Sequence, residues 1–116
     1  MNEDTLTSLL VERLLRWRAA PDRFIKSGRE WLPRWRFRPF ERMDDALALA
    51  DASGAVDIRI TRNGSTFVAE IKMQSAVGKA QANSWARATT YALCEALGID
   101  PGGSQAVPGQ ERLATK

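Results

Sequence analysis

Apolar residues recur at helical spacing in two stretches of the chain, one near each end. Over residues 5–18 they stand three to four positions apart, which predicts a helix with one buried side. A second long helix is predicted over residues 79–97, where alanine, leucine and aromatic residues again follow a helical period. Gly98 stands in the position typical of a helix C-terminal cap, and Pro101 beyond it supports the same end point.

Between these two predicted helices, the chain alternates apolar and polar residues in a way that is typical of strands. Residues 56–61 and 66–72 both alternate with period two, and Asn63-Gly64 between them is the strongest short signal for a two-residue hairpin turn. The pattern therefore predicts an antiparallel hairpin with one apolar face and one polar face.

The position of the turn decides which side chains of this hairpin meet. If Asn63 and Gly64 are its two central residues, the strands pair symmetrically about them and Asp57 lies directly opposite Glu70. Because side chains alternate between the faces of a strand, Asp57, Glu70 and Lys72 share one face. The other face carries Val56, Ile58, Ile60, Phe67, Ala69 and Ile71. We expect the apolar face to pack inward and the acidic pair to line a cleft beside the first helix.

The remaining segments complete the predicted fold. Residues 31–40 alternate aromatic residues with arginine and end near a proline, so we interpret them as an extended, partly exposed segment. Residues 41–52 favour a helix, although the apolar run 46–50 is also compatible with a short buried strand. We expect one small α/β domain over residues 1–100, with helices flanking a mainly antiparallel sheet, and a loose tail over residues 101–116.

Two residue types limit the chemistry that this chain can perform. The sequence has no histidine, which excludes Ser-His and Cys-His nucleophile pairs, His-ligated zinc and a histidine general base. Cys94 is the only cysteine, and its apolar surroundings predict a buried thiol. Hydrolytic chemistry must therefore rest on carboxylates, lysine and metal. No apolar run approaches the roughly 20 residues that cross a bilayer, and the chain starts with acidic residues, so we expect a soluble cytoplasmic protein.

The net charge of +3 is unevenly distributed along the chain. Residues 1–42 hold ten Lys and Arg against six Asp and Glu, whereas residues 43–116 hold seven against eight. The N-terminal excess suits a polyanion, with DNA as the expected partner. The candidate contacts for phosphates and bases are Arg34, Trp35, Arg36, Arg38 and, on the hairpin, Arg59. An equally good interpretation of residues 31–40 is an aromatic cluster over the edge of the core with solvated arginines.

The predicted pairing of two carboxylates across the hairpin needs compensation, because Asp57 and Glu70 would repel each other. Mg²⁺ or Mn²⁺ would provide it, since these ions favour oxygen ligands and keep open positions for water and a phosphate oxygen. Lys72 would project beside such a metal, where it could hold the attacking water or offset charge in the transition state. The alternative is an ordinary solvated hairpin face with a surface ion pair, which contributes little to stability.

Asp57, twelve intervening residues and then Glu70-Ile71-Lys72 resemble the motif of the PD-(D/E)xK nuclease superfamily. The proline of that motif is absent, and an apolar pair stands before Asp57 instead. The resemblance implies a restriction-endonuclease-like core. It also implies that Asp57, Glu70 and the carbonyl of Ile71 bind Mg²⁺ or Mn²⁺, with Lys72 as the catalytic lysine.

Two further positions fit the superfamily pattern. Glu12, on the first predicted helix, is similar to the extra acidic residue of resolvase-like members, although it would equally well pair with Arg16. Gln81, at the start of the predicted helix after the motif strand, is similar to the glutamine of virus-type replication-repair nucleases, with Trp85 where some members have tyrosine. A polar residue in the first turn of a helix explains Gln81 equally well.

Together these features predict a metal-dependent nuclease in which a metal-bound water attacks a DNA phosphodiester. We expect a homodimer, because two sites are needed to cut both strands and the chain is small. The alternative is a non-catalytic module with the same fold that binds nucleic acid or another protein.

Overall fold

The computed structural model describes residues 2–100 of the 116-residue chain, so the predicted tail over residues 101–116 lies outside the described residues. Two of the elements are not regular α-helices or strands: η1 is a π-helix that continues α1, and η2 is a short 3-10 helix. The elements run in the order α1 (Glu3–Leu10), η1 (Val11–Leu15), β1 (Arg18–Ala19), β2 (Arg23–Ser27), β3 (Glu30–Pro33), η2 (Arg34–Arg36), α2 (Met43–Ala52), β4 (Asp57–Asn63), β5 (Thr66–Lys72), β6 (Val77–Ala82) and α3 (Trp85–Ala96).

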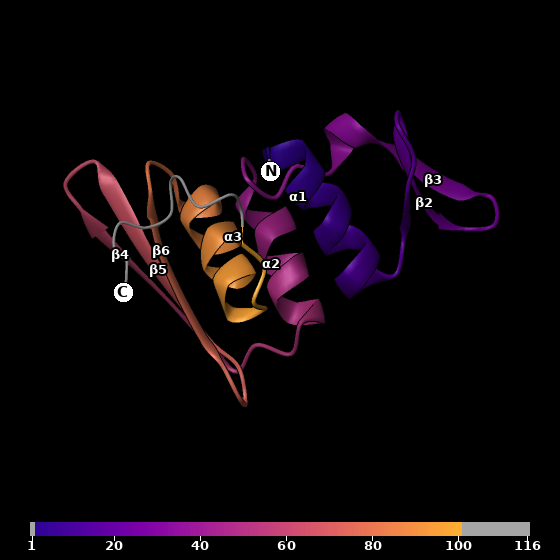
Figure 1. The fold of residues 1–116 in the computed structure, drawn as a ribbon. Helices are drawn as coiled ribbons and strands as arrows, with labels where there is room; N and C mark the ends of the chain where they lie inside the picture. The colour runs from indigo at the N-terminus through magenta and orange to yellow at the C-terminus, as the bar shows by residue number, and fades with distance from the viewer. Residues whose placement is uncertain (1, 101–116) are drawn as a thin grey trace.

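Helices and two small sheets are arranged in layers (Figure 1). The sheet β4-β5-β6 forms one side of the molecule, α3 lies against it with α2 beside α3, α1 follows, and the sheet β1-β2-β3 lies at the opposite end. Both sheets are three-stranded and antiparallel. The predicted α/β fold, with a mainly antiparallel sheet and flanking helices, is confirmed. Among residues 2–100, no helix is long and apolar enough to span a membrane.

The first predicted helix is present but ends earlier than predicted. α1 begins after Asn2, whose side chain accepts a hydrogen bond of 2.7 Å from the backbone N–H of Thr5. The helical path stops at Arg16, which adopts a left-handed conformation with a φ of +62°. A residue in the left-handed region is a common end of a helix. The helical segment therefore covers residues 3–15 rather than 5–18.

The two segments that precede the hairpin agree only partly with the prediction. The interpretation of residues 41–52 as a helix is confirmed by α2. Residues 31–40 are extended only as far as Pro33, the last residue of β3. The next residues form η2, which is closed by a hydrogen bond of 3.2 Å from the backbone N–H of Phe37 to the carbonyl of Arg34. The prediction of an extended segment was therefore wrong for the arginine-rich part.

The predicted hairpin is confirmed as β4 and β5, but its turn lies one residue later than predicted. Asn63 pairs with Thr66, so the central residues of the turn are Gly64 and Ser65. Gly64 has a φ of +66°, whereas Ser65 is not among the residues with a positive φ. This matches a type II′ turn, which has glycine at its first central position, rather than the type I′ turn that Asn63-Gly64 suggested.

The largest error of the sequence analysis concerns residues 79–82, which were predicted as the start of the last helix. They belong to β6, which pairs antiparallel with β5. α3 begins only at Trp85, after Ser84 as the N-cap, whose hydroxyl accepts a hydrogen bond of 3.1 Å from the backbone N–H of Arg87. The two alanines of residues 79–82 favour a helix, but pairing with β5 overrides that propensity.

Gly78 in β6 allows the sheet to approach α3 closely. A Cβ atom at this position would collide with the backbone carbonyl of Ala92 and would lie 2.9 Å from the Cβ of Ala96. Only glycine leaves room for this contact between strand and helix. One face of the sheet is therefore firmly covered by α3.

The core forms where the covered face of β5 meets the helices. Ala69 and Ile71 of β5 are fully buried, as is Leu93 of α3. Phe24 of β2 is also fully buried and belongs to the same cluster, so it anchors the distant sheet to the core. Cys94 is buried as predicted, and burial raises the pKa of its thiol to about 12.

Candidate functional site

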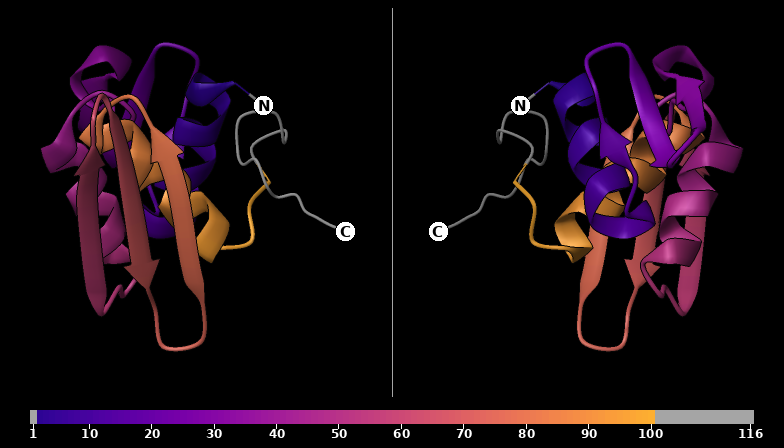
Figure 2. Two further views of the ribbon diagram at one scale, coloured as in Figure 1. Left: turned by 90° about the vertical axis from the view of Figure 1, so that its left-hand side faces the viewer. Right: turned by 90° about the vertical axis from the view of Figure 1, so that its right-hand side faces the viewer.

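The sheet β4-β5-β6 is covered by helices on only one of its faces (Figure 2, left view). The covered face contains Ala69 and Ile71, so the alternate positions of the strands lie on the uncovered face. That uncovered face carries Asp57, Arg59, Glu70, Lys72, Lys79 and Gln81. The prediction that the three motif residues share one face is confirmed. The predicted cleft beside the first helix is wrong, because α1 lies on the far side of α2 and α3 (Figure 1).

The register on this face differs from the predicted one. Asp57 lies opposite Lys72, and Glu70 lies between Arg59 on one side and Lys79 on the other. The prediction that Asp57 lies directly opposite Glu70 is therefore wrong. Moving a turn by one residue shifts every pair by two positions, which keeps each side chain on its face but changes its partner. The shared face was thus predictable without the correct register, whereas the acidic pair was not.

Each carboxylate on the uncovered face has a cation as its neighbour. Asp57 accepts a hydrogen bond of 3.1 Å from Nε of Arg59, and the two side chains are 42% and 69% exposed. Across residues 2–100, no group of three or more His, Cys, Asp and Glu side chains could hold a metal. The side chain of Ile71, whose carbonyl was a predicted ligand, is buried on the opposite face. These residues fit a divalent metal poorly, because the charge that a metal would supply already comes from arginine and lysine.

Of the two additional catalytic candidates, Gln81 shares the uncovered face with the motif residues and Glu12 does not. Glu12 lies in η1, which continues α1, and accepts a hydrogen bond of 3.0 Å from the backbone N–H of Ala19. Within the described residues it forms no ion pair with Arg16 either. Gln81 lies on the uncovered face in β6, opposite Val68, and not in the first turn of a helix. The predicted catalytic group therefore lacks Glu12, and it receives Gln81 from a strand instead of a helix.

The second candidate region is at the other end of the molecule. We call residues 16–38, which contain β1, β2, β3 and η2, the basic arm. It holds eight Lys and Arg against two Asp and Glu, a net charge of +6, although the whole chain carries only +3. Figure 1 shows its β2–β3 hairpin projecting from the body, at the end opposite to the sheet β4-β5-β6. Positive charge is thus concentrated in the basic arm, partly on its hairpin and partly on the segments beside it.

Aromatic rings connect the basic arm to the core and also reach its surface. At the base, the ring of the buried Phe24 contacts those of Trp17 and Phe37, with centroids 6.4 and 6.2 Å away. At the surface, Trp31 and Trp35 are 52% and 65% exposed. The guanidinium groups of Arg23 and Arg36 lie over these two tryptophans, 4.4 and 5.8 Å from the ring centroids. Arginine with exposed aromatic rings is the combination that nucleic-acid-binding surfaces use.

Several cations of the basic arm have no acidic partner. Among the residues that the structure describes, five exposed side chains of the arm have no carboxylate within ion-pair distance: Arg16, Arg18, Lys26, Arg29 and Arg36. Of these five, only Arg36 was predicted from the sequence. Lys26, Arg29 and the exposed Trp31 were not predicted, although basic residues on both sides of Gly28 were a usable signal for a basic hairpin tip.

Two other predicted contacts are already engaged within the protein. Arg34 is half-buried and donates hydrogen bonds to the carbonyl of Ala20 at 2.8 Å and to the hydroxyl of Ser8 at 2.7 Å. Arg38 pairs with Glu41 at 2.6 Å. The two interpretations of this segment therefore apply to different residues, because Arg34 helps to cover the core edge while Arg36 and Trp35 face solvent.

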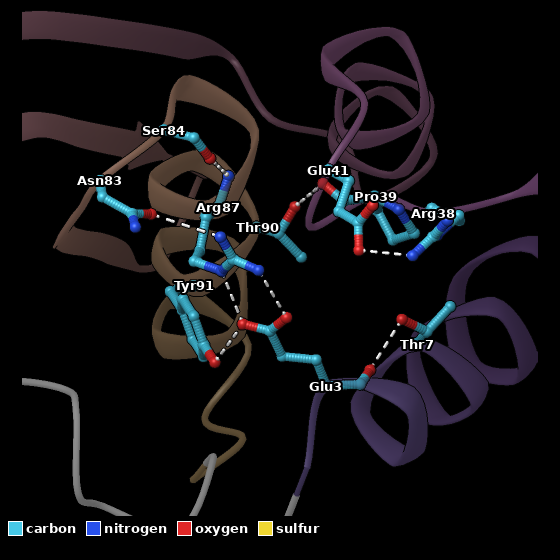
Figure 3. Close-up of polar contacts among 10 residues, drawn as sticks. All are labelled: Glu3, Thr7, Arg38, Pro39, Glu41, Asn83, Ser84, Arg87, Thr90 and Tyr91. Carbon is cyan, nitrogen blue, oxygen red and sulfur yellow. Dashed lines mark hydrogen bonds and ion pairs between the residues drawn. The ribbon is translucent and has the colours of Figure 1, made fainter.

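A groove of about 460 Å³ lies at the foot of the basic arm. It is bordered by the start of α1, by η2 and by the segment that follows η2. Figure 3 labels four of its lining residues, from α1 and from the segment after η2. The lining residues are Glu3, Asp4, Thr7, Phe24, Arg34, Trp35, Phe37, Arg38, Phe40 and Glu41.

Glu3, which lines this groove, belongs to a polar network (Figure 3). Glu3 of α1 accepts hydrogen bonds from Arg87 of α3 at 2.8 and 3.0 Å and from the hydroxyl of Tyr91 at 2.9 Å. The Arg87 guanidinium lowers the pKa of the Glu3 carboxyl despite its partial burial. Burial, together with the bond to Glu3, raises the pKa of Tyr91. Glu3 is therefore ionised and held in place near neutral pH.

Comparison with known proteins informs the fold but not the function. No protein-family model matches the chain, and no curated protein matches its sequence. A phage protein from Bacillus cereus ATCC 14579, solved as a crystal structure at 2.0 Å, is similar in fold, with a TM-score of 0.68 over 86% of this chain and 91% of that chain. The two sequences are 15% identical, so the similarity concerns the fold alone. The function must therefore be inferred from the residues of this chain.

Proposed function

We propose that this protein binds nucleic acid through the basic arm, without bound metal and without chemical change to the nucleic acid. The observation that carries the proposal is the charge of +6 on residues 16–38, whose exposed cations lie in the projecting hairpin and in the segments on either side of it. Five of these cations have no carboxylate partner among residues 2–100, so they are available to phosphates. Binding that depends on phosphate contacts is expected to be strongly salt-dependent, because condensed counterions are released.

The number of free cations sets the size of the expected salt effect. If all five contact phosphates of a duplex, the logarithm of the binding constant falls against the logarithm of the salt concentration with a slope of about −4.5. Base stacking on the exposed tryptophans would add affinity with little dependence on sequence. The proposal therefore predicts a binding protein with weak sequence preference.

The experiment compares two triple variants that remove the same charge from different places. One replaces Lys26, Arg29 and Arg36 of the basic arm by alanine. The matched control replaces Arg59, Lys72 and Lys79 of the uncovered sheet face. Affinity for labelled duplex and single-stranded DNA and RNA is measured by fluorescence anisotropy over a series of salt concentrations. The arm variant is expected to reduce the slope by about 3 and the affinity by at least tenfold, whereas the control changes neither strongly.

The outcome that contradicts the proposal is equally specific. If the two variants lose affinity to the same degree, net charge alone governs the interaction and the arm has no special role. If the wild-type protein binds none of these nucleic acids at low salt, the proposal fails altogether.

Metal-dependent DNA hydrolysis at Asp57, Glu70 and Lys72 is a second candidate function. The observation that favours it is that the three side chains of the PD-(D/E)xK-like motif share one uncovered face. This function is less well supported than binding by the basic arm, because Asp57 and Glu70 are not paired with each other and each has a cation as its neighbour. A homodimer belongs to this second proposal, because cutting both strands needs two sites.

Metal titration separates the two candidate functions. The nuclease proposal expects Mg²⁺ or Mn²⁺ to raise the unfolding temperature of the wild type and not that of Asp57→Ala. It also expects cleavage of linear, nicked, branched or single-stranded DNA that is lost in Lys72→Ala. The binding proposal expects no metal-dependent stabilisation and no difference in cleavage between wild type and Lys72→Ala on any of these substrates.

A further inference from the structure

The groove at the foot of the basic arm combines two kinds of surface. Its lining includes three buried aromatic residues, Phe24, Phe37 and Phe40, and the exposed Trp35. Its polar lining brings acceptors and donors together, since carboxylates of α1 lie near guanidinium groups of η2 and the following segment. The groove therefore offers aromatic surface together with hydrogen-bonding groups, a combination that small-molecule sites use for affinity and orientation.

The charges in the groove compensate each other. Arg34 lies 3.5 Å from the carboxylate of Asp4, Arg38 pairs with Glu41 at 2.6 Å, and Glu3 pairs with Arg87 at 2.8 Å. A charged ligand would have to break one of these pairs to gain a partner. An uncharged, planar ligand with polar edges would keep them, while its edge accepts from arginine and donates to carboxylate oxygen.

The surroundings of the groove narrow the choice of ligand. Residues that line it belong to η2 in the basic arm, so a chain whose phosphates lie on the arm can reach the groove with its next residue. A nucleobase is planar and uncharged, has donors and acceptors on its edges, and stacks on aromatic rings. A base within a duplex is covered by its neighbours and its partner strand, whereas an unpaired base is free to enter.

We propose that the groove binds one unpaired base of a single-stranded nucleic acid, with Trp35 as the stacking partner. This inference rests on the proposed nucleic-acid binding by the basic arm and adds its preferred substrate class. The phosphates lie on the cations of the arm, and the base enters between Trp35 and the Asp4–Arg34 pair. The protein then distinguishes single strands with bases from any other polyanion.

The test uses a single strand of about 15 nucleotides, the same strand built from abasic residues, and the corresponding duplex, all at one salt concentration. Wild-type protein is expected to bind the single strand about tenfold more tightly than the abasic strand, since stacking on an aromatic ring is worth about that factor or more per base. Trp35→Ala should remove most of this preference, and the remaining part is the share of stacking on Trp31. Trp35→Phe should retain most of the preference, because phenylalanine still stacks.

Trp85→Ala is the matched control, because Trp85 is a 48% exposed tryptophan at the start of α3 that packs on Phe67 of the other sheet. It should leave the preference for bases unchanged. Unfolding temperatures of all three variants show whether each is folded, and the 65% exposure of Trp35 predicts a small change there.

Each contrary result has a distinct meaning. If wild type binds the abasic strand, the duplex and the single strand equally, the base site is refuted while nucleic-acid binding by the arm stands. If Trp35→Ala weakens all three ligands by the same factor, Trp35 only shapes the arm and the base site is again refuted. If nothing binds, both proposals fail.

Discussion

The two charged regions of this protein differ in how far their cations and carboxylates compensate each other. On the uncovered face of β4-β5-β6, cations and carboxylates alternate across the strands, as in the row Arg59, Glu70, Lys79. On the basic arm, five cations stand without a carboxylate among the described residues. Alternating charges stabilise the surface that carries them, whereas unmatched charges of one sign attract a partner. The basic arm is therefore a better candidate for binding a charged partner than the uncovered face of the sheet.

A short motif on a hairpin does not show which side chains are neighbours unless the strand register is known. Asp57, Glu70 and Lys72 have the residue types and spacing of a nuclease motif, yet the strand pairing gives each acid a basic neighbour. Spacing along the chain decides which face a side chain occupies, and only the turn decides what stands opposite. A motif on a hairpin is therefore informative about chemistry only once the turn is known.

The first and largest predicted effect tests whether the basic arm is a fixed part of the molecule. Phe24→Ala should reduce the free energy of unfolding by about 4 kcal/mol, because it removes a fully buried ring that packs on Trp17 and Phe37. Urea unfolding followed by far-UV circular dichroism measures the change. Trp31→Ala is the control, since a half-exposed ring should cost much less. A loss below about 1 kcal/mol in Phe24→Ala would mean that the arm is not anchored in the core.

The next effect tests the close contact that covers one face of the other sheet. Gly78→Ala should cost about 3 kcal/mol, because the added methyl group collides with the backbone of Ala92 and α3 must move away. Gln81→Ala in the same strand lies on the uncovered face and should change stability by no more than about 0.5 kcal/mol. Equal unfolding midpoints for these two variants would show that α3 does not pack on β6 as described.

A smaller effect, with a pH signature, concerns the network that joins α1 to α3 beside the groove. The folded-state pKa of Glu3 is lowered from 4.5, so its stabilising contribution is complete above that pH and is lost as the pH falls through the folded-state value. Glu3→Gln should therefore cost about 1 kcal/mol at pH 7, and the difference from wild type should shrink as the pH drops below 4.5.

Denaturant unfolding of wild type and Glu3→Gln at several pH values measures this dependence. Asp51→Asn is a suitable control, because Asp51 is an exposed carboxylate for which the described residues provide no ion pair. If the loss in free energy of unfolding caused by Glu3→Gln is the same from pH 7 to the acid range, the charge of Glu3 does not contribute and the loss comes from packing alone.

Much of the fold was predictable from the sequence, for identifiable physical reasons. Period-two alternation fixed the faces of β4 and β5, and helical spacing located most of α1 and α3. The register was not predictable, because Asn63-Gly64-Ser65 contains both an Asn-Gly pair for a type I′ turn and a Gly-Ser pair for a type II′ turn. The strand β6 was not predictable either, because its alanines favour a helix and only pairing with β5 stabilises the extended conformation.

The candidate site was predictable only where its residues are close in sequence. The arginines and tryptophan of η2 were found, because they follow one another directly. The groove was not, since it joins α1, β2 and the segment after η2, and no local pattern records that these segments meet. The hairpin tip with Lys26 and Arg29 was not predicted, although both residues stand close to Gly28 in the sequence.

The smallest predicted effect is that of Glu70→Gln on the free energy of unfolding, and its sign distinguishes the two strand registers. If Glu70 lay directly opposite Asp57, as a metal site of the predicted kind requires, Glu70→Gln would remove a repulsion and stabilise the metal-free protein. In the observed register Glu70 stands between Arg59 and Lys79, so the same substitution should destabilise it by about 0.5 kcal/mol. The penalty should vanish in about 1 M salt, where exposed charges are screened. Chelator-treated protein is unfolded at low and high salt, with Gln81→Ala as the uncharged control on the same face. If Glu70→Gln is more stable than wild type at low salt, Glu70 does lie beside Asp57, and this result would support the proposal of a metal-dependent nuclease.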